Sequence, residues 1–278
     1  GWAARAKREA RVAGADASCY RLLVEGLRDK FRVAPVTVCL AASMVAAYVL
    51  ELFVQVGFSP EALSLFALSG NALGRGMWWT LVTHLFLHAN LLHLAVNVLG
   101  LWFIGPEVEL TLGRGRYVAL YLVSGVAGGL LQTAFAVPSS ELIGASGSVC
   151  GVLLSFTTAY PQTPLQALLF FVLPVKMKAR TLGWGLIGVS VLCAALHILP
   201  QIGHLAHLGG ALAGAALTRW WLRPGEAPAT RPLPPATTDD LLERVMEAGI
   251  EGLTREERRH LENLAPKRRG RHRGSGRW

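Results

Sequence analysis

The middle of this 278-residue chain has very little charge. Only twelve Asp, Glu, Lys or Arg residues lie between positions 36 and 222, so most of the 27 basic and 18 acidic residues are concentrated in the two ends. A water-soluble protein with so few charges over such a length would expose one large apolar surface. The composition therefore predicts an integral membrane protein. It excludes a cytosolic enzyme, a disordered chain and a nucleic-acid partner, although the net charge of +9 alone would suggest the last.

The chain has few cysteines, and one long region of it has no acidic residue. The four cysteines are Cys19, Cys39, Cys150 and Cys193. Their spacing indicates neither a metal site nor a disulfide framework. From Leu142 to Gly225 there is no Asp or Glu at all. We therefore expect no metal and no cofactor, and a catalytic site in that region would have to work without a carboxylate.

Six apolar segments qualify as membrane spans, for which about 20 residues are needed and fewer inside a bundle. They are residues 36–56, 91–104, 117–135, 146–160, 181–196 and 207–221. A seventh apolar run, 165–173, is short and lies between two prolines, so we expect an interfacial or re-entrant segment there. The sequence predicts an all-α, multi-pass membrane protein with a six-helix bundle.

The basic residues test this topology independently, because Lys and Arg of short loops stay on the cytoplasmic side. Six spans with both termini inside leave only Arg75 outside the cytoplasm. A seventh span would move the basic C-terminal tail to the outside. Tryptophans at the predicted span edges, Trp78, Trp79, Trp220 and Trp221, fit an interfacial belt.

The two ends of the chain form the remaining predicted segments. Residues 1–35 are a basic cytoplasmic segment, too long and too charged for a cleaved signal peptide, so the first span should stay as an anchor. Residues 36–222 form the six-span domain, and the prolines of 223–237 indicate a linker. Capping signatures predict two short helices within 238–266. We expect 267–278 to be a disordered basic tail, with attraction to anionic lipid headgroups as the alternative.

Polar side chains are costly inside a bilayer, so each one is a candidate for function. The candidates are the acids Glu51, Glu107 and Glu109, and the residues His84, His88, His93, Asn97, Ser146, Ser148, His197, His204 and His207. The predicted topology puts all six histidines in the extracytoplasmic half. Their convergence predicts a site on that side.

Ser146 stands between Gly144 and Gly147 at the outer end of the fourth predicted span. The first turn of a helix there leaves N–H donors that can hold an oxyanion. A nucleophilic serine needs a base within hydrogen-bond reach, and His207 opens the sixth span at the same membrane surface. His204, three residues earlier, is an alternative base that periodicity does not exclude.

Glycines spaced four residues apart accompany both groups. The pairs are Gly147 with Gly151 and Gly210 with Gly214. Such pairs let helices approach closely, and the second pair shares a helical face with His207. Plain helix packing would explain either pair alone. In combination with Ser146 and His207 they favour a catalytic Ser-His dyad, since no acid is available for a triad.

His93 and Asn97 lie one turn apart on one face of the second predicted span. An imidazole and an amide there could donate to the oxyanion of a tetrahedral intermediate, an effect worth roughly 3 kcal/mol per donor. A polar pair that bonds between helices is the alternative.

These motifs together resemble the rhomboid family of intramembrane serine proteases. The resemblance covers about residues 36–222 and rests on Gly144-x-Ser146-Gly147-xxx-Gly151, His93-xxx-Asn97, His207-xx-Gly210-xxx-Gly214, the stretch from Thr83 to His88, and Gly105 with Glu109 and Gly113. One departure is visible, because Thr80 follows Trp79 where the family commonly has Arg. The C-terminal helices are similar to a cytoplasmic appendage of some bacterial rhomboids.

The resemblance implies Ser146 as nucleophile, His207 as general base, and an oxyanion hole made by His93, Asn97 and the Ser146 amide. It further implies single-span membrane proteins as substrates, cut near their extracytoplasmic end, and a bacterial inner membrane location. Two other functions stay open: a catalytically inactive relative that binds membrane clients, and a transporter lined by His84, His88 and His93. The oligomeric state stays undetermined.

Overall fold

The computed structural model describes residues 33–57, 60–169, 173–199 and 202–222, together with Val245, Ile250 and Arg258. The chain divides into two units, Gly1–Pro228 and Ala229–Trp278, and almost everything described belongs to the first. The N-terminal basic segment up to residue 32, the proline-rich linker, the two tail helices and the basic tail lie outside the described residues, apart from those three isolated positions. The boundaries expected for them stay predictions.

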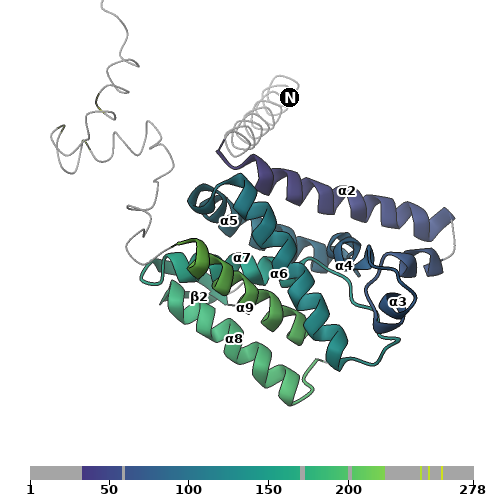
Figure 1. Cartoon of the computed structure of the whole chain (residues 1–278). Coiled ribbons are helices and arrows are strands. Elements are labelled where there is room, and N and C mark those ends of the chain that lie inside the picture. The colour runs from purple at the N-terminus through teal and green to yellow at the C-terminus, as the bar shows by residue number, and fades with distance from the viewer. Residues whose placement is uncertain are drawn as a thin grey trace, which may run out of the picture. The chain divides into compact units, whose positions relative to one another are not determined.

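Six helices occupy the places of the six predicted spans (Figure 1). They are α2 Pro35–Gly57, α5 Leu91–Leu112, α6 Arg114–Phe135, α7 Ser146–Ala159, α8 Ala179–Ala195 and α9 His204–Trp221. Within the described part of the chain, α2, α5 and α6 are long and apolar enough to cross a membrane, while α7 and α8 are apolar but shorter. The fold is thus mostly helical with at least three candidate spans. The six-span topology and its orientation stay predictions.

The outside of the bundle is apolar. Phe53 on α2, Phe103 on α5 and Trp184 on α8 are each about 70% exposed, at 69%, 71% and 72%. A water-soluble protein would bury side chains of this kind, whereas lipid accepts them. This exterior belongs to an integral membrane protein, as the charge distribution predicted.

α5 runs further than the second predicted span, which ended at Ile104. It continues through Pro106 to Leu112 and ends at Gly113, whose positive φ of 79° favours glycine. The added turns carry Glu109, a buried carboxylate that accepts the N–H groups of Val36 and Thr37 at 3.1 and 2.8 Å and the Thr37 hydroxyl at 2.9 Å. This acid of α5 therefore caps the start of α2.

The segment after α7 forms a β-hairpin of β1 Pro164–Leu169 and β2 Leu173–Lys178. The strands pair antiparallel, with Pro164 opposite Lys178 and Leu169 opposite Leu173. We expected a re-entrant or interfacial segment here and assigned no strands. Pairing two short runs satisfies backbone groups that a helix too short to span would leave open at its ends. Its position at the membrane surface stays a prediction.

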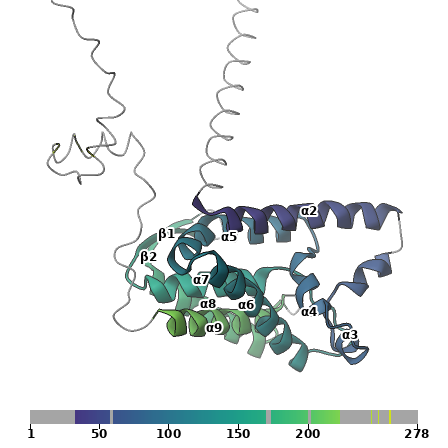
Figure 2. The ribbon, with the colours of Figure 1, turned by 45° about the horizontal axis from the view of Figure 1, so that its top comes forward.

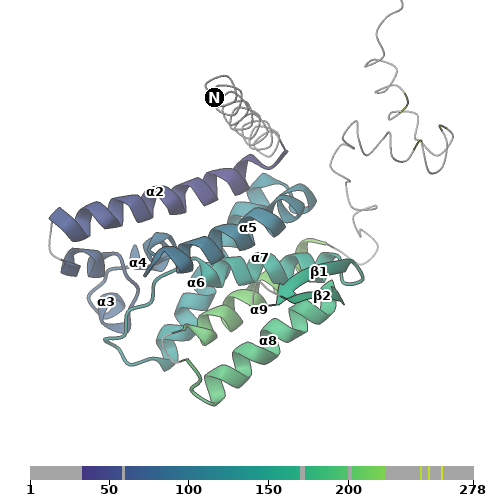
Figure 3. The same cartoon turned by 180° about the vertical axis from the view of Figure 1, so that it is seen from behind.

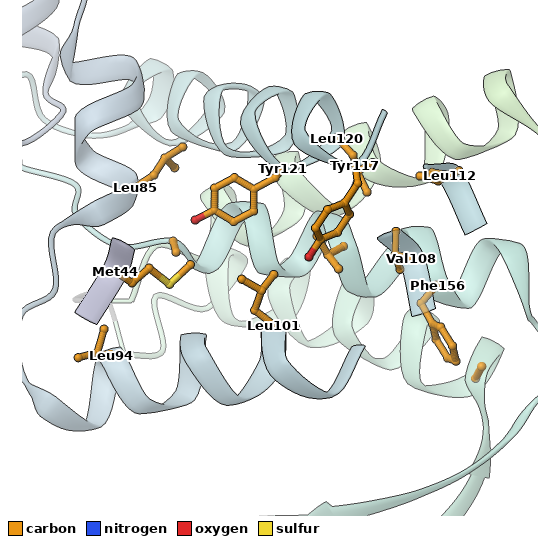
Figure 4. Close-up of a cluster of buried hydrophobic side chains, with 13 residues drawn as sticks. Met44, Leu85, Leu94, Leu101, Val108, Leu112, Tyr117, Leu120, Tyr121 and Phe156 are labelled. Carbon is orange, nitrogen blue, oxygen red and sulfur yellow. The ribbon is translucent and has the colours of Figure 1, made fainter. Parts of the chain in front are cut away.

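α7 lies at the centre of the bundle, with α2 and α8 on opposite sides (Figures 1 and 3). It packs against α5, α6, α8 and α9. The buried cluster that joins α2, α5, α6 and α7 includes Met44, Leu101, Tyr117, Tyr121 and Val152. Most of these side chains are drawn in Figure 4 between the helices. The bundle therefore holds the N-terminus of α7 in a fixed place.

Short elements gather at one end of the bundle, and the hairpin lies at the other (Figure 2). They are η1 Pro60–Leu65, α3 Gly70–Gly74, α4 Thr80–Thr83 and η2 His84–Phe86. Leu68 and Leu142 exchange backbone hydrogen bonds of 3.0 and 2.7 Å, which ties this region to the segment before α7. Thr80, the departure from the family pattern, is buried, and its hydroxyl donates to the Met77 carbonyl at 2.7 Å.

Candidate active site

Ser146 and His207 meet where two helices begin. Ser146 is the first residue of α7, and His207 lies in the first turn of α9. The Nε2 atom of His207 is 2.8 Å from the hydroxyl oxygen of Ser146, and both side chains are half-buried. An unprotonated Nε2 can accept the serine proton at this distance. The arrangement has the geometry of an activated nucleophile.

Glycine makes this approach possible, because α7 and α9 touch backbone to backbone. A Cβ on Gly210 would collide with the Gly147 carbonyl oxygen, and one on Gly214 would collide with the Gly151 carbonyl oxygen. The two glycine pairs singled out in the sequence thus face one another, one helical turn apart. No side chain larger than hydrogen fits at Gly210 or Gly214 without moving a helix.

Gln132 supports the base from α6, and the sequence analysis did not single it out. Its side-chain oxygen accepts the N–H groups of Leu205 and Ala206, both at 3.2 Å. These are first-turn donors of α9 without an intrahelical partner, so Gln132 caps the helix that carries His207. The available signal was a polar amide inside an otherwise apolar predicted span.

His93 lies over the loop that leads into Ser146. Gly144 adopts a φ of +117° that glycine tolerates, and a Cβ there would come within 2.5 Å of the His93 ring. The Gly144 N–H donates to the His84 carbonyl at 2.8 Å. The absence of a side chain at Gly144 and its hydrogen bond to the loop before α5 therefore let the imidazole of His93 lie close to the start of α7.

Asn97 is buried one turn further along α5. Its amide nitrogen donates to the His93 carbonyl at 2.8 Å, which uses one of its two N–H groups. The second N–H remains for another acceptor. Asn90 begins the same helix, and its side chain accepts the His93 N–H at 2.9 Å. Both contacts support the first turns of α5, which carry His93.

The remaining histidines have separate places. His84 and His88 are buried before α5, and burial lowers the pKa of each to about 4, with the neighbouring His93 adding to the effect at His88. His204 points its Nε2 at the Ile198 carbonyl, 2.8 Å away, and its ring centroid is 6.2 Å from that of His207. His197 is exposed in the turn after α8.

The positions of the histidines bear on two alternatives, His204 as the base and a group of side chains that holds a metal ion. The ring nitrogen that contacts Ser146 belongs to His207, while the contacting nitrogen of His204 is engaged by a carbonyl. Across the described ranges, no three His, Cys, Asp or Glu side chains are grouped so as to hold a metal ion. The geometry thus favours His207 over His204 as a partner for the serine.

Comparison with known proteins shows to which family the chain belongs. Residues 75–224, more than half of the chain, match the rhomboid domain. The chain belongs to the rhomboid family. This confirms the resemblance seen in the motifs, and a rhomboid domain built from apolar helices is an integral membrane protein.

Relatives of this rhomboid come from distant organisms. Rhomboid protease GluP of Bacillus subtilis (strain 168) is 34% identical over 157 residues, which are 55% of this chain and 28% of that protein. RHOMBOID-like protein 2 of Arabidopsis thaliana is 34% identical over 147 residues, 50% of this chain and 41% of the relative. Rhomboid protein 1, mitochondrial, of Saccharomyces cerevisiae is 30% identical over 150 residues, which are 49% of this chain and 40% of that protein.

The matched part spans less than half the length of each of these relatives. The rhomboid domain match, residues 75–224, contains α5 to α9 and therefore both Ser146 and His207. The family includes intramembrane serine proteases, and other members are inactive. Membership therefore establishes the family and leaves activity to the chemistry of this chain's own residues.

Proposed function

We propose that this rhomboid is an intramembrane serine endopeptidase that cuts single-span membrane proteins near the extracytoplasmic end of their transmembrane segment. The observation that carries the proposal is the 2.8 Å contact between the Ser146 hydroxyl and His207 Nε2 at the start of α7. An inactive relative would have no need to keep a base so close to a serine that begins a helix.

In the first half of the reaction, His207 takes the proton of Ser146 as the hydroxyl oxygen attacks the scissile carbonyl. A tetrahedral intermediate forms, and the carbonyl oxygen becomes an oxyanion. His207 then gives its proton to the leaving amine as the peptide bond breaks. An acyl-enzyme on Ser146 and a free amine product remain.

We assign three donors to the oxyanion. The Ser146 N–H opens α7 and has no partner within its own helix, and the partial positive charge of the helix N-terminus adds to its effect. His93 and the unused amide N–H of Asn97 are the side-chain donors. Groups of this kind bind the developing charge more tightly than the neutral carbonyl, and each is worth roughly 3 kcal/mol.

Water completes the cycle. A water molecule that has lost its proton to His207 attacks the acyl carbon, and the second tetrahedral intermediate collapses to release the carboxylate product and restore the Ser146 hydroxyl. Ser146 and His207 are only half-buried, although the exterior of the bundle is apolar, and hydrolysis requires that water reach them. The site should therefore open to the aqueous side rather than to lipid.

The substrate must bring an extended peptide to Ser146. A regular transmembrane helix uses its carbonyls in its own hydrogen bonds, so clients whose outer end is easily unwound by Gly, Pro or small residues should be cut first. Small side chains beside the cut would suit a serine whose neighbours along the chain, Gly144, Ala145 and Gly147, are themselves small and buried. We place the enzyme in a bacterial inner membrane.

Cleavage in proteoliposomes tests the proposal. A single-span reporter with a Gly-containing outer end should be cut by the wild type and by His204→Ala, and cut at most at background rates by Ser146→Ala or His207→Ala. Because no metal or cofactor takes part, a chelator should leave the rate unchanged.

Two outcomes would overturn the proposal. Cleavage by Ser146→Ala would exclude the serine mechanism. Binding of the reporter by the wild type without any cleavage would favour the inactive, client-binding alternative.

A further inference from the structure

Glu51 is a buried acid of α2 that the reaction scheme leaves without a role. Only 4% of its surface is exposed. Both carboxylate oxygens are 3.2 Å from the backbone nitrogen of His88, which donates to them. Burying a carboxylate is costly unless it is hydrogen-bonded, so a specific contact across 37 positions of sequence indicates that Glu51 holds this loop in place.

His88 is fixed by further contacts. Its ring is 1% exposed, and its Nδ1 atom lies 3.1 Å from the Phe86 carbonyl. Because a carbonyl only accepts, Nδ1 carries the proton and Nε2 is unprotonated. This Nε2 is buried and has no hydrogen-bond partner within the described residues. The low pKa that burial gives His88 keeps the ring neutral at the pH of the cell.

The His88 ring lies against His93, a residue of the candidate active site. Its centroid is 5.2 Å from that of His93, in an edge-to-face arrangement with an interplanar angle of 65°. His93 in turn packs against Gly144, two residues before Ser146. A chain of contacts thus runs from the Glu51 carboxylate through His88 to the imidazole that lies beside the nucleophile.

We propose that Glu51 is a positioning residue, which sets the His93 ring for the oxyanion by holding His88 behind it. This inference rests on the proposed serine protease function, and it assigns Glu51 to the same site from a different helix. Glu51 touches neither substrate nor the reacting atoms. Its effect on the reaction must therefore pass through His93.

Glu109 provides a matched control. It is a second buried carboxylate, only 2% exposed, and it also accepts backbone N–H groups across a helix contact. Its partners are Val36 and Thr37 at the first turn of α2, not the loop that carries His88. Replacing either acid by glutamine removes the charge from a buried hydrogen bond, which the amide oxygen can still accept, but only Glu51 is connected to His93.

A double-mutant cycle with the reporter separates positioning from mere stability. We expect Glu51→Gln to lower kcat about tenfold with little change in KM. In a His93→Ala background, the same substitution should lower kcat by less than about a further twofold. Glu109→Gln should lower the melting temperature in detergent and leave kcat per folded enzyme unchanged in both backgrounds. Folded enzyme is counted as the monodisperse fraction in gel filtration.

The cycle can overturn the inference in several ways. A wild-type kcat for Glu51→Gln, or the same fold-loss with and without His93, would exclude positioning through His93. If Glu51→Gln does not fold, Glu51→Asp, which keeps the charge and shortens its reach, takes its place; failure of both to fold would make the residue purely structural. Failure of the proposed function itself would appear separately, as cleavage that survives Ser146→Ala.

Discussion

At the residue scale, the site has to orient a histidine without a carboxylate. The sequence contains no acid from Leu142 to Gly225, and the ring of His207 is held instead by packing and by its serine partner. Gln132 caps the helix that carries it, and the edge of His204 faces it at a centroid distance of 6.2 Å. In the proposed dyad, helix packing would take over the orienting role that an aspartate has in a triad.

Buried neutral histidines make stability depend on pH. Burial lowers the pKa of His84 and His88 from 6.5 to about 4. Between these values the unfolded chain binds protons that the folded protein does not, so the free energy of unfolding falls as the pH drops from about 6.5 to about 4. Melting curves in detergent should show a lower transition at pH 5 than at pH 7.5.

The variant His84→Gln gives the control for that measurement. It removes one of the buried titrating groups, so the difference between the two pH values should become smaller. An equal difference in the variant and the wild type would show that His84 does not contribute.

At the element scale, the decisive contact is the glycine-lined meeting of α7 and α9. It places two helix starts close enough for their first-turn side chains to react, while α6 covers them through Gln132. Each glycine removes a side chain that would separate the helices by more than a hydrogen bond can span. The geometry of the proposed dyad is therefore a property of the helix pair as much as of Ser146 and His207.

A pair of glycine substitutions tests this contact. Gly210→Ala would put a methyl group on the Gly147 carbonyl, which should cost roughly 1–3 kcal/mol and lower both the melting temperature and the cleavage rate. Gly188→Ala on α8 meets no atom within 4 Å, and alanine is the better helix former by up to about 1 kcal/mol. That control should melt at the same or a higher temperature with unchanged activity. Equal melting temperatures for the two variants would contradict the packing argument.

At the scale of the whole molecule, the bundle has two different ends. The short elements α3 and α4 and the starts of α5 and α9 lie at one end (Figure 2). The segment that leads to Ser146 is hydrogen-bonded to this region through Leu142 and Gly144. The hairpin, which carries Lys176 and Lys178, lies at the other end. If the basic end is cytoplasmic, the site faces outward. The basis for the predicted side of cleavage is therefore this asymmetry.

The side of cleavage can be read from the clients. Comparing the membrane proteome of a Ser146→Ala strain with that of the wild type should reveal single-span proteins whose new termini lie at the extracytoplasmic end of the span. Cuts at the cytoplasmic end would refute the topology. The client identities would also show whether small residues flank the cut.

Much of this arrangement follows from local sequence rules. The predicted starts of the six helices lie within a few residues of the observed starts. The motifs singled out Ser146, His207, His93 and both glycine pairs. The hairpin was missed because two short apolar runs between prolines do not reveal whether they pair. The roles of Glu51, Glu109 and Gln132 depend on partners 37 to 74 positions away, and no periodicity carries that information.

The covalent bond to Ser146 tests the central claim most directly. The purified protein should be treated with a fluorophosphonate, digested and sequenced by mass spectrometry. We predict one adduct, on the Ser146 hydroxyl, which His207→Ala reduces to background and His204→Ala retains. An adduct on another residue, or labelling of Ser146 that is unaffected by His207→Ala, would contradict the dyad.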